Sequence, residues 1–164
     1  MRYAARAAAS LAFGLATIVT VWPGTAVAQA APNMAAQADV PDEAALARLV
    51  WAAMVTLDNA NDSGDYGVLH ATGSQELRRA NTPEQLAATF APMRDNRIDL
   101  TRTLSVMPTY YLAPAFDAQG RLRLRGAFEQ RPRTVRFDLL FAFEGGEWRP
   151  SALSVVDVAA DAPR

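Results

Sequence analysis

The chain contains no cysteine and no lysine, and its only histidine is His70. Without cysteine there is no disulfide bond, thiolate zinc site, cysteine nucleophile or lipoprotein anchor. One histidine and scattered carboxylates do not supply a histidine-based metal site. All 16 basic residues are arginine and alanine is abundant, a composition typical of bacterial genomes rich in G and C. We therefore expect a domain that folds on its apolar core alone, with no metal and no cofactor.

The first 28 residues have the pattern of a Sec-type signal peptide. Arg2 and Arg6 precede an uncharged run over residues 7–21, and Ala26-Val27-Ala28 offers the small residues that a signal peptidase requires. The run of about 15 residues is shorter than the roughly 20 of a spanning helix, which argues against an uncleaved anchor. The sequence predicts a periplasmic or secreted protein, cleaved after Ala28 or alternatively after Ala30, which meets the membrane only before cleavage.

The remaining chain has the length of one domain and a slightly acidic charge. Without Arg2 and Arg6, 14 arginines face 17 acidic residues, a net charge of about −3. A nucleic-acid-binding domain is normally basic, so this class of partner is disfavoured. We expect a flexible lead-in over residues 29–40, one domain over residues 41–158, and a frayed tail over residues 159–164.

Helical spacing dominates the first half of this domain. The pattern predicts a helix from Pro41 to about Asp58, a turn over residues 59–64 because Asn, Asp, Ser and Gly favour turns, and a short helix over residues 65–71. The first helix has an apolar stripe with a spacing of three and four residues: Leu46, Leu49, Val50, Ala53, Met54 and Leu57.

A capping box marks the start of a third helix. In Thr82-Pro83-Glu84-Gln85, the threonine oxygen can accept a free amide hydrogen and the glutamine side chain can reach back to the cap. Pro92 lacks an amide hydrogen, so we expect this helix to kink or break close to Ala91.

From Arg97 onward the apolar period changes to two, which is typical of strands. The alternation predicts a half-buried strand over residues 97–106, a hairpin of two strands around Arg131-Pro132, and a last strand that runs to Val156 with a bulge at Pro150. Gly145-Gly146 fits a tight hairpin turn. Because apolar residues occupy even positions on one hairpin strand and odd positions on the other, we expect the pairs Leu122/Phe141, Leu124/Leu139 and Phe128/Val135.

This order of elements gives an α+β fold in which N-terminal helices pack on an antiparallel β-sheet meander. Together with Gly-Gly-Glu-Trp-Arg over residues 145–149, it resembles the nuclear transport factor 2-like (NTF2-like, cystatin-like cone) superfamily, here in an exported bacterial branch. The resemblance spans residues 41–158. It implies a curved sheet, a cone-shaped fold and a pocket between helices and sheet, in a superfamily that includes isomerases, cyclases, dehydratases and non-catalytic binding or assembly modules.

Two groups of side chains are candidates for ligand binding. Aromatic residues with a polar atom suit a pocket between helices and sheet, although they suit a core equally well: Trp51, Tyr66, Tyr110 and Trp148. Arginines on two neighbouring strands form a candidate face for an anionic ligand: Arg121, Arg123, Arg125 and Arg136. The alternative for these arginines is a solvated face, because the predicted register places Arg125 opposite Asp138.

His70 and Asp58 are the candidates for acid or base catalysis, and each also has a structural interpretation as a surface or capping group. No phosphate-binding loop, nucleophile elbow or metalloprotease helix is present in the sequence. We therefore expect a non-catalytic binding domain for a small molecule or protein partner, with a homodimer left open. The alternative is an enzyme of the isomerase or dehydratase type.

Overall fold

A computed structural model describes residues 39–163 of the chain. The expected signal peptide and all but the last two residues of the expected lead-in lie outside these residues. The described part contains five α-helices, a 3₁₀ helix and one antiparallel sheet, so the predicted α+β class is confirmed.

The long helix α1, Glu43–Ser63, forms as predicted but ends later than expected. Asp42 caps its start, because its side chain accepts a hydrogen bond of 2.7 Å from the amide of Ala45. The predicted end at Asp58 is wrong. Ala60 and Asn61 are buried and extend the inward-facing side of the helix. Residues 59–63, which were expected to form a turn, therefore continue the helix to its end. Gly64 ends the helix with a φ of 72°.

Four shorter helices follow: α2 Gly67–Thr72, α3 Gln75–Ala80, α4 Pro83–Thr89 and α5 Ala91–Asp95. The capping box of Thr82 and Gln85 is present, and the expected break falls at Phe90, two residues before Pro92. Helix α3 was not predicted. It buries only Leu77, too little for an apolar stripe, and it depends on the side-chain cap of Ser74.

The strand predicted over residues 97–106 is wrong. Its middle is the 3₁₀ helix η2, Thr101–Ser105. Asp99 bends the chain, because its Oδ1 accepts hydrogen bonds from both the amide (2.8 Å) and the hydroxyl (2.5 Å) of Thr101. Leu104, which the alternation placed inside, is exposed. A local side-chain turn thus overrides the period of two.

The sheet has the order β1-β3-β4-β5, and β2 also pairs with β3. Its strands are β1 Thr109–Tyr110, β2 Ala115–Phe116, β3 Leu122–Phe128, β4 Arg133–Glu144 and β5 Glu147–Ala159. The three predicted pairs across β3 and β4 are all present: Leu122/Phe141, Leu124/Leu139 and Phe128/Val135. Gly145 and Gly146 take positive φ in the last turn, and the register shifts beside Pro150 as expected for a bulge. Strand β5 continues through Asp157, beyond its predicted end.

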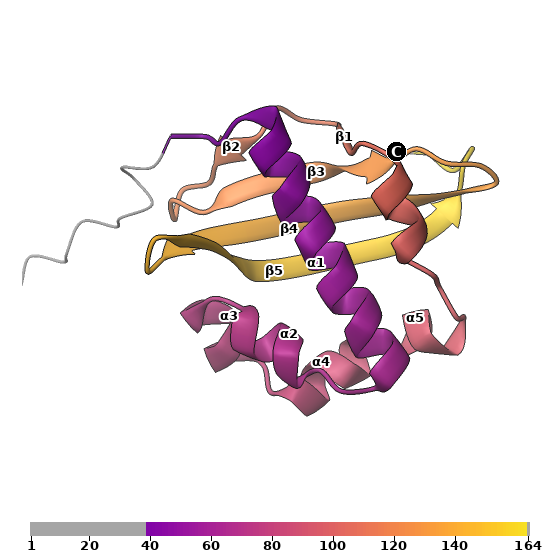
Figure 1. Ribbon diagram of the computed structural model, residues 1–164, viewed down its shortest axis with the longest axis horizontal. Helices are drawn as coiled ribbons and strands as arrows, with labels where there is room; N and C mark the ends of the chain where they lie inside the picture. The colour runs from indigo at the N-terminus through magenta and orange to yellow at the C-terminus, as the bar shows by residue number, and fades with distance from the viewer. Residues whose placement is uncertain (1–38, 164) are drawn as a thin grey trace, which may run out of the picture. The chain divides into compact units, whose positions relative to one another are not determined.

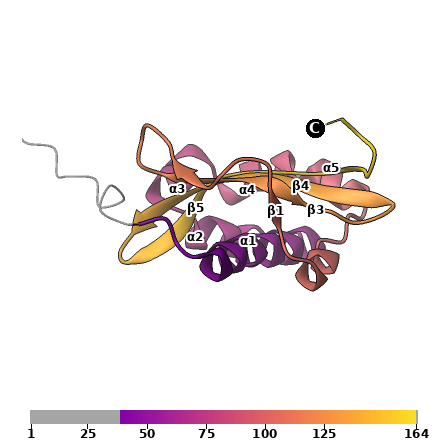
Figure 2. The same ribbon diagram turned by 90° about the horizontal axis from the view of Figure 1, so that it is seen from above.

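Helix α1 crosses one face of the sheet, and helices α3 to α5 lie beyond the β5 edge (Figures 1 and 2). Helix η2 follows α5 and packs beside α1 near the ends of β4 and β5. The core lies between α1 and the sheet, and it includes Val50, Met54 and Leu57 of α1 together with Leu124 and Phe141 of the sheet. This arrangement brings the loop between α5 and η2 close to the end of β5.

Candidate functional site

The four aromatic candidates lie in separate environments. The indole of Trp51 joins α1 to η2, donating to the carbonyl oxygens of Thr103 (3.3 Å) and Val106 (3.2 Å). Tyr66 is buried in the core. Of five hollows in the described residues, only one is lined by a candidate, Trp148, so none of these five gathers the aromatic candidates together.

The other two aromatic candidates pack against the sheet. Tyr110 meets Phe137 edge-on, and burial raises the pKa of its hydroxyl to about 12. Trp148 stacks on Phe116 and also contacts Phe143. Trp148 lines a hollow beside α1, whereas Tyr110 packs against the core.

The arginines of the sheet face are largely paired with acidic groups of the same domain. Asp138 binds Arg123 through hydrogen bonds of 2.9 and 2.5 Å and lies 3.8 Å from Arg125. Arg121 pairs with Asp117 and with Glu76 of α3. Arg136 donates to the backbone carbonyl oxygens of Ala162 and Pro163. Much of the positive charge that suggested an anionic ligand is therefore matched internally.

The two catalytic candidates are not brought together. His70 lies on α2 with its Nε2 3.3 Å from the carbonyl oxygen of Arg78. Asp58 lies on α1 and lines a hollow with residues of α5 and the following loop, and His70 does not line that hollow.

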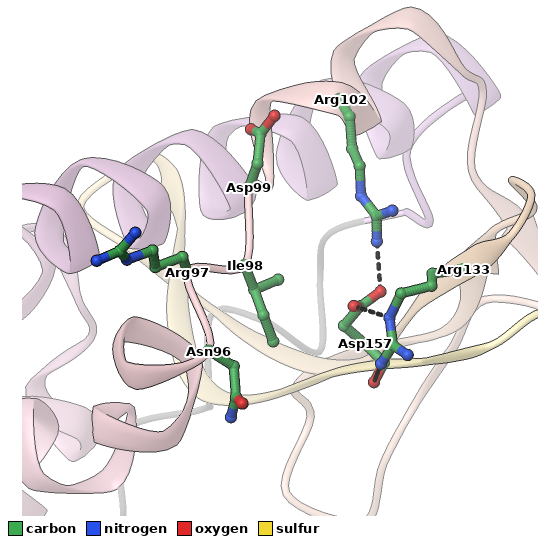
Figure 3. Close-up of a pocket in the computed structure, with 7 residues that line it drawn as sticks. All are labelled: Asn96, Arg97, Ile98, Asp99, Arg102, Arg133 and Asp157. Atoms are coloured by element: carbon green, nitrogen blue, oxygen red, sulfur yellow. Dashed lines mark hydrogen bonds and ion pairs between the residues drawn. The ribbon is translucent and has the colours of Figure 1, made fainter.

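The Asp157 hollow, of about 540 Å³, lies where the loop between α5 and η2 meets the start of β4 and the last part of β5 (Figure 3). Its lining residues are Asn96, Arg97, Ile98, Asp99, Arg102, Arg133 and Asp157. Three guanidinium groups and two carboxylates give this hollow a net positive charge.

A buried carboxylate organises this hollow. The side chain of Asp157 is only 7% exposed, and its two oxygens bind Arg102 and Arg133 separately. Arg133 also donates to the backbone carbonyl oxygen of Asp157 over 2.7 Å. The Nε of Arg102 is buried and has no hydrogen-bond partner. Figure 3 shows both arginines turned toward Asp157, while Arg97 points away from it.

Arg97 connects this hollow to a second one. It has a left-handed backbone with a φ of 51°, a conformation uncommon for a residue with a side chain, and it makes no ion pair with another described residue. The second hollow, of about 470 Å³, is called the Asp58 hollow. Its lining residues are Asp58, Asn61, Asp62, Met93, Arg94, Arg97, Ile98, Asp99 and Thr101.

The carboxyl group of Asp58 is almost fully buried. Burial raises its pKa above the ordinary value for aspartate, and the nearby charges of Asp62 and Asp99 act in the same direction. One hydrogen bond opposes them, since Oδ1 accepts from the amide of Leu100 over 2.8 Å. In contrast, the Thr101 hydroxyl lowers the pKa of Asp99.

Asp58→Asn is expected to stabilise the domain at neutral pH. Because the folded pKa of Asp58 exceeds the unfolded value, the stability this carboxyl contributes is present at acid pH and lost as the pH rises through the folded pKa. Asparagine keeps an oxygen for the amide of Leu100 and carries no charge. Urea unfolding at several pH values should therefore show a gain that shrinks with acidification.

The matched control for this measurement is Asp62→Asn, which removes an exposed carboxylate one turn further along α1. We expect it to change the unfolding free energy less than Asp58→Asn does. A loss of stability in Asp58→Asn that is the same at every pH would contradict the role of desolvation at this carboxyl.

No family model, curated protein or solved structure matches this chain. None of the helices in the part of the chain that the structure describes is long and apolar enough to cross a membrane. Within residues 39–163, no group of three or more histidine, aspartate or glutamate side chains is placed to hold a metal ion.

Sequence reasoning did not single out Arg97, Arg102, Arg133 or Asp157 as a group. One signal was present. Leu153 and Val155 face the core, so Asp157 occupies the next inward-facing position of the same alternation. A carboxylate at such a position needs a cationic partner, and this could have indicated an arginine pair.

Proposed function

We propose that the protein is an exported, non-catalytic binding domain whose ligand is a small molecule with an anionic group, held in the Asp157 hollow. The observation that carries the proposal is the pair of arginines fixed by one buried carboxylate. One carboxylate oxygen of Asp157 binds Arg102 and the other binds Arg133, so both guanidinium groups are held in a fixed orientation. Each guanidinium has further N–H groups that these ion pairs do not use. A preorganised arginine pair is suited to a carboxylate or phosphate.

Three further properties belong to this proposal. The protein acts in the periplasm or outside the cell after cleavage of residues 1–28, and its α+β domain is a cone-shaped member of the NTF2-like superfamily. The alternatives to a small molecule are a protein partner and a homodimer. A nucleic acid is not among the proposed partners. Without residues 1–28 the chain has 17 carboxylates and 14 arginines, an acidic balance that disfavours a nucleic acid.

Inorganic phosphate is the simplest probe of the Asp157 hollow. We expect saturable binding by isothermal titration calorimetry, weakened about tenfold or more in Arg102→Gln and in Arg133→Gln, because a hydrogen bond to a charged group contributes about 1.5–3 kcal/mol. Arg79→Gln on α3 is the matched control, since it removes the same charge from an exposed position outside the hollow. Equal affinity in all three variants would overturn the proposal.

An enzyme of the isomerase or dehydratase type is the second candidate function. The observation in its favour is Asp58, a buried carboxyl with a raised pKa that lines a hollow. The two functions differ in what Asp58→Asn does in the producing bacterium. A folded Asp58→Asn variant that binds small molecules as tightly as the unmodified protein does, yet reproduces the phenotype of a deletion strain, would favour the enzyme.

A further inference from the structure

Three side chains beneath the Asp58 hollow form a chain of hydrogen bonds. Arg94 donates from Nη1 to the hydroxyl of Tyr66 over 2.9 Å, and this hydroxyl donates to Oδ1 of Asn61 over 2.5 Å. The same Nη1 donates to the carbonyl oxygen of Ala87 over 2.8 Å. Two of the three side chains, Tyr66 and Asn61, are more than nine-tenths buried.

The chemistry of this chain fixes the orientation of the Asn61 amide. A guanidinium can only donate, so the hydroxyl of Tyr66 must accept from Arg94 and give its own proton to Asn61. The oxygen of Asn61 therefore faces Tyr66, and its NH₂ group faces the other way. The tyrosine ring stacks on Phe90 with ring centres 6.2 Å apart, and the guanidinium of Arg94 lies over the ring, 5.5 Å from its centre. Both contacts limit rotation of the ring.

The NH₂ group of Asn61 is a buried donor without a partner. Its Nδ2 is enclosed and makes no hydrogen bond, although buried polar groups in proteins are nearly always paired. Asn61 lies three residues after Asp58 on α1, so the two side chains share one face of the helix and both line the same hollow. The amide of Asn61 and the carboxyl group of Asp58 thus belong to side chains that line one hollow.

The charges around this hollow argue against an ion as the occupant. A metal ion would meet the donor groups of Arg94, Arg97 and Asn61. An anion would meet three carboxylates against two guanidinium groups, the reverse of the balance in the Asp157 hollow. A neutral group that carries an acceptor and a donor next to each other satisfies both Asn61 and Asp58. A carboxamide has this arrangement, with its carbonyl oxygen and N–H in one plane.

We propose that the Asp58 hollow is a binding site for a carboxamide group, whose carbonyl oxygen accepts a hydrogen bond from Asn61 Nδ2 and whose N–H donates to Asp58. The proposal extends the proposed function to a second hollow, and it is carried by residues that do not line the Asp157 hollow. Arg94 and Tyr66 are positioning residues, because they act on the ligand only through the orientation of Asn61.

Acetamide is the probe that tests this site. In ¹⁵N-labelled protein expressed from the full chain, NMR titration should give saturable shifts of the Asn61 side-chain NH₂ and of the Leu100 amide, which binds Asp58. Asn61→Asp keeps the oxygen that faces Tyr66 but removes the donor, so we expect acetamide to bind about fivefold or more weakly. The control is Asn59→Asp, which adds the same charge at an exposed position of α1.

A second comparison does not depend on a variant. Dimethylacetamide retains the carbonyl oxygen but lacks the N–H, so it should bind more weakly than acetamide to the unmodified protein. Shifts that rise linearly with both probes, or equal affinities of Asn61→Asp and Asn59→Asp for acetamide, would overturn the carboxamide site. Phosphate is titrated into the same samples, so the failure of one hollow is distinguished from the failure of the other.

Discussion

Replacing Phe141 with aspartate is expected to unfold the domain. Phe141 is 1% exposed, lies in the middle of the core and pairs with Leu122 across the sheet. Loss of a buried phenylalanine costs about 3–5 kcal/mol, and a buried unpaired carboxylate adds several more. The sum reaches the whole stability of a typical domain, about 5–15 kcal/mol. We therefore expect no cooperative unfolding transition in circular dichroism and collapsed amide dispersion in NMR spectra.

Val156→Asp is the control for this substitution. Val156 lies on β5 of the same sheet, but it is 48% exposed and its side chain lies on the opposite face. A new carboxylate there stays in water, so the unfolding midpoint should change little. A folded Phe141→Asp protein with a midpoint near that of Val156→Asp would show that the core is not where the structure places it.

Gly126→Ala is expected to have the second largest effect on stability. A Cβ atom at this position would lie 2.0 Å from the carbonyl oxygen of Thr109 and 3.0 Å from the ring of Phe137. The first contact is with backbone of the paired strand β1, which cannot rotate away as a side chain can. Overpacking costs about 1–3 kcal/mol, and we expect the upper part of this range.

Urea unfolding and amide exchange together test this prediction. Besides a lower unfolding free energy, the amide of Tyr111 should exchange faster, because its bond to the carbonyl oxygen of Arg125 depends on the position of β1. Gly145→Ala is the matched control: a Cβ there meets nothing within 4 Å, and only the positive φ costs about 1–2 kcal/mol. A smaller loss in Gly126→Ala than in Gly145→Ala would argue against the close approach of β1.

The register of β3 and β4 could be predicted because it depends on parity. A strand with one buried face allows its apolar residues on one side only, so a shift by one residue would expose all of them. The capping box at Thr82 and the break before Pro92 were equally predictable, because each depends on a residue with one strong local preference.

The failed prediction of a strand over residues 97–106 has a different cause. Residues 97–106 alternate like a strand, but Asp99 accepts two hydrogen bonds from Thr101. In addition, Asp58 accepts a hydrogen bond from the backbone amide of Leu100. The bond between Asp58 and Leu100 joins α1 to a segment 42 residues further along the chain. A pattern built from neighbouring residues cannot predict such a long-range contact.

The candidate site was only partly accessible from sequence for the same reason. Asp58 was selected as an ionisable residue near a turn, whereas Asn61 was assigned to the turn itself. The significance of Asn61 comes from Tyr66 at the start of α2, which bonds it directly, and from Arg94 of α5, which bonds Tyr66. The aromatic candidates were selected by residue type alone, which does not distinguish a pocket from a core.

The bulge beside Pro150 has a consequence for self-association. It presents the carbonyl oxygen of Pro150 to the amide of Ser74 at 2.8 Å, and Ser151 donates to Glu76 at 2.6 Å, so α3 docks on the β5 edge. At the other edge, β1 and β2 both pair with β3. Exposed strand edges are templates for β-aggregation. Helix α3 at one edge and two short strands at the other thus block the approach of a further strand there, protecting the folded chain from joining edge to edge into fibrils.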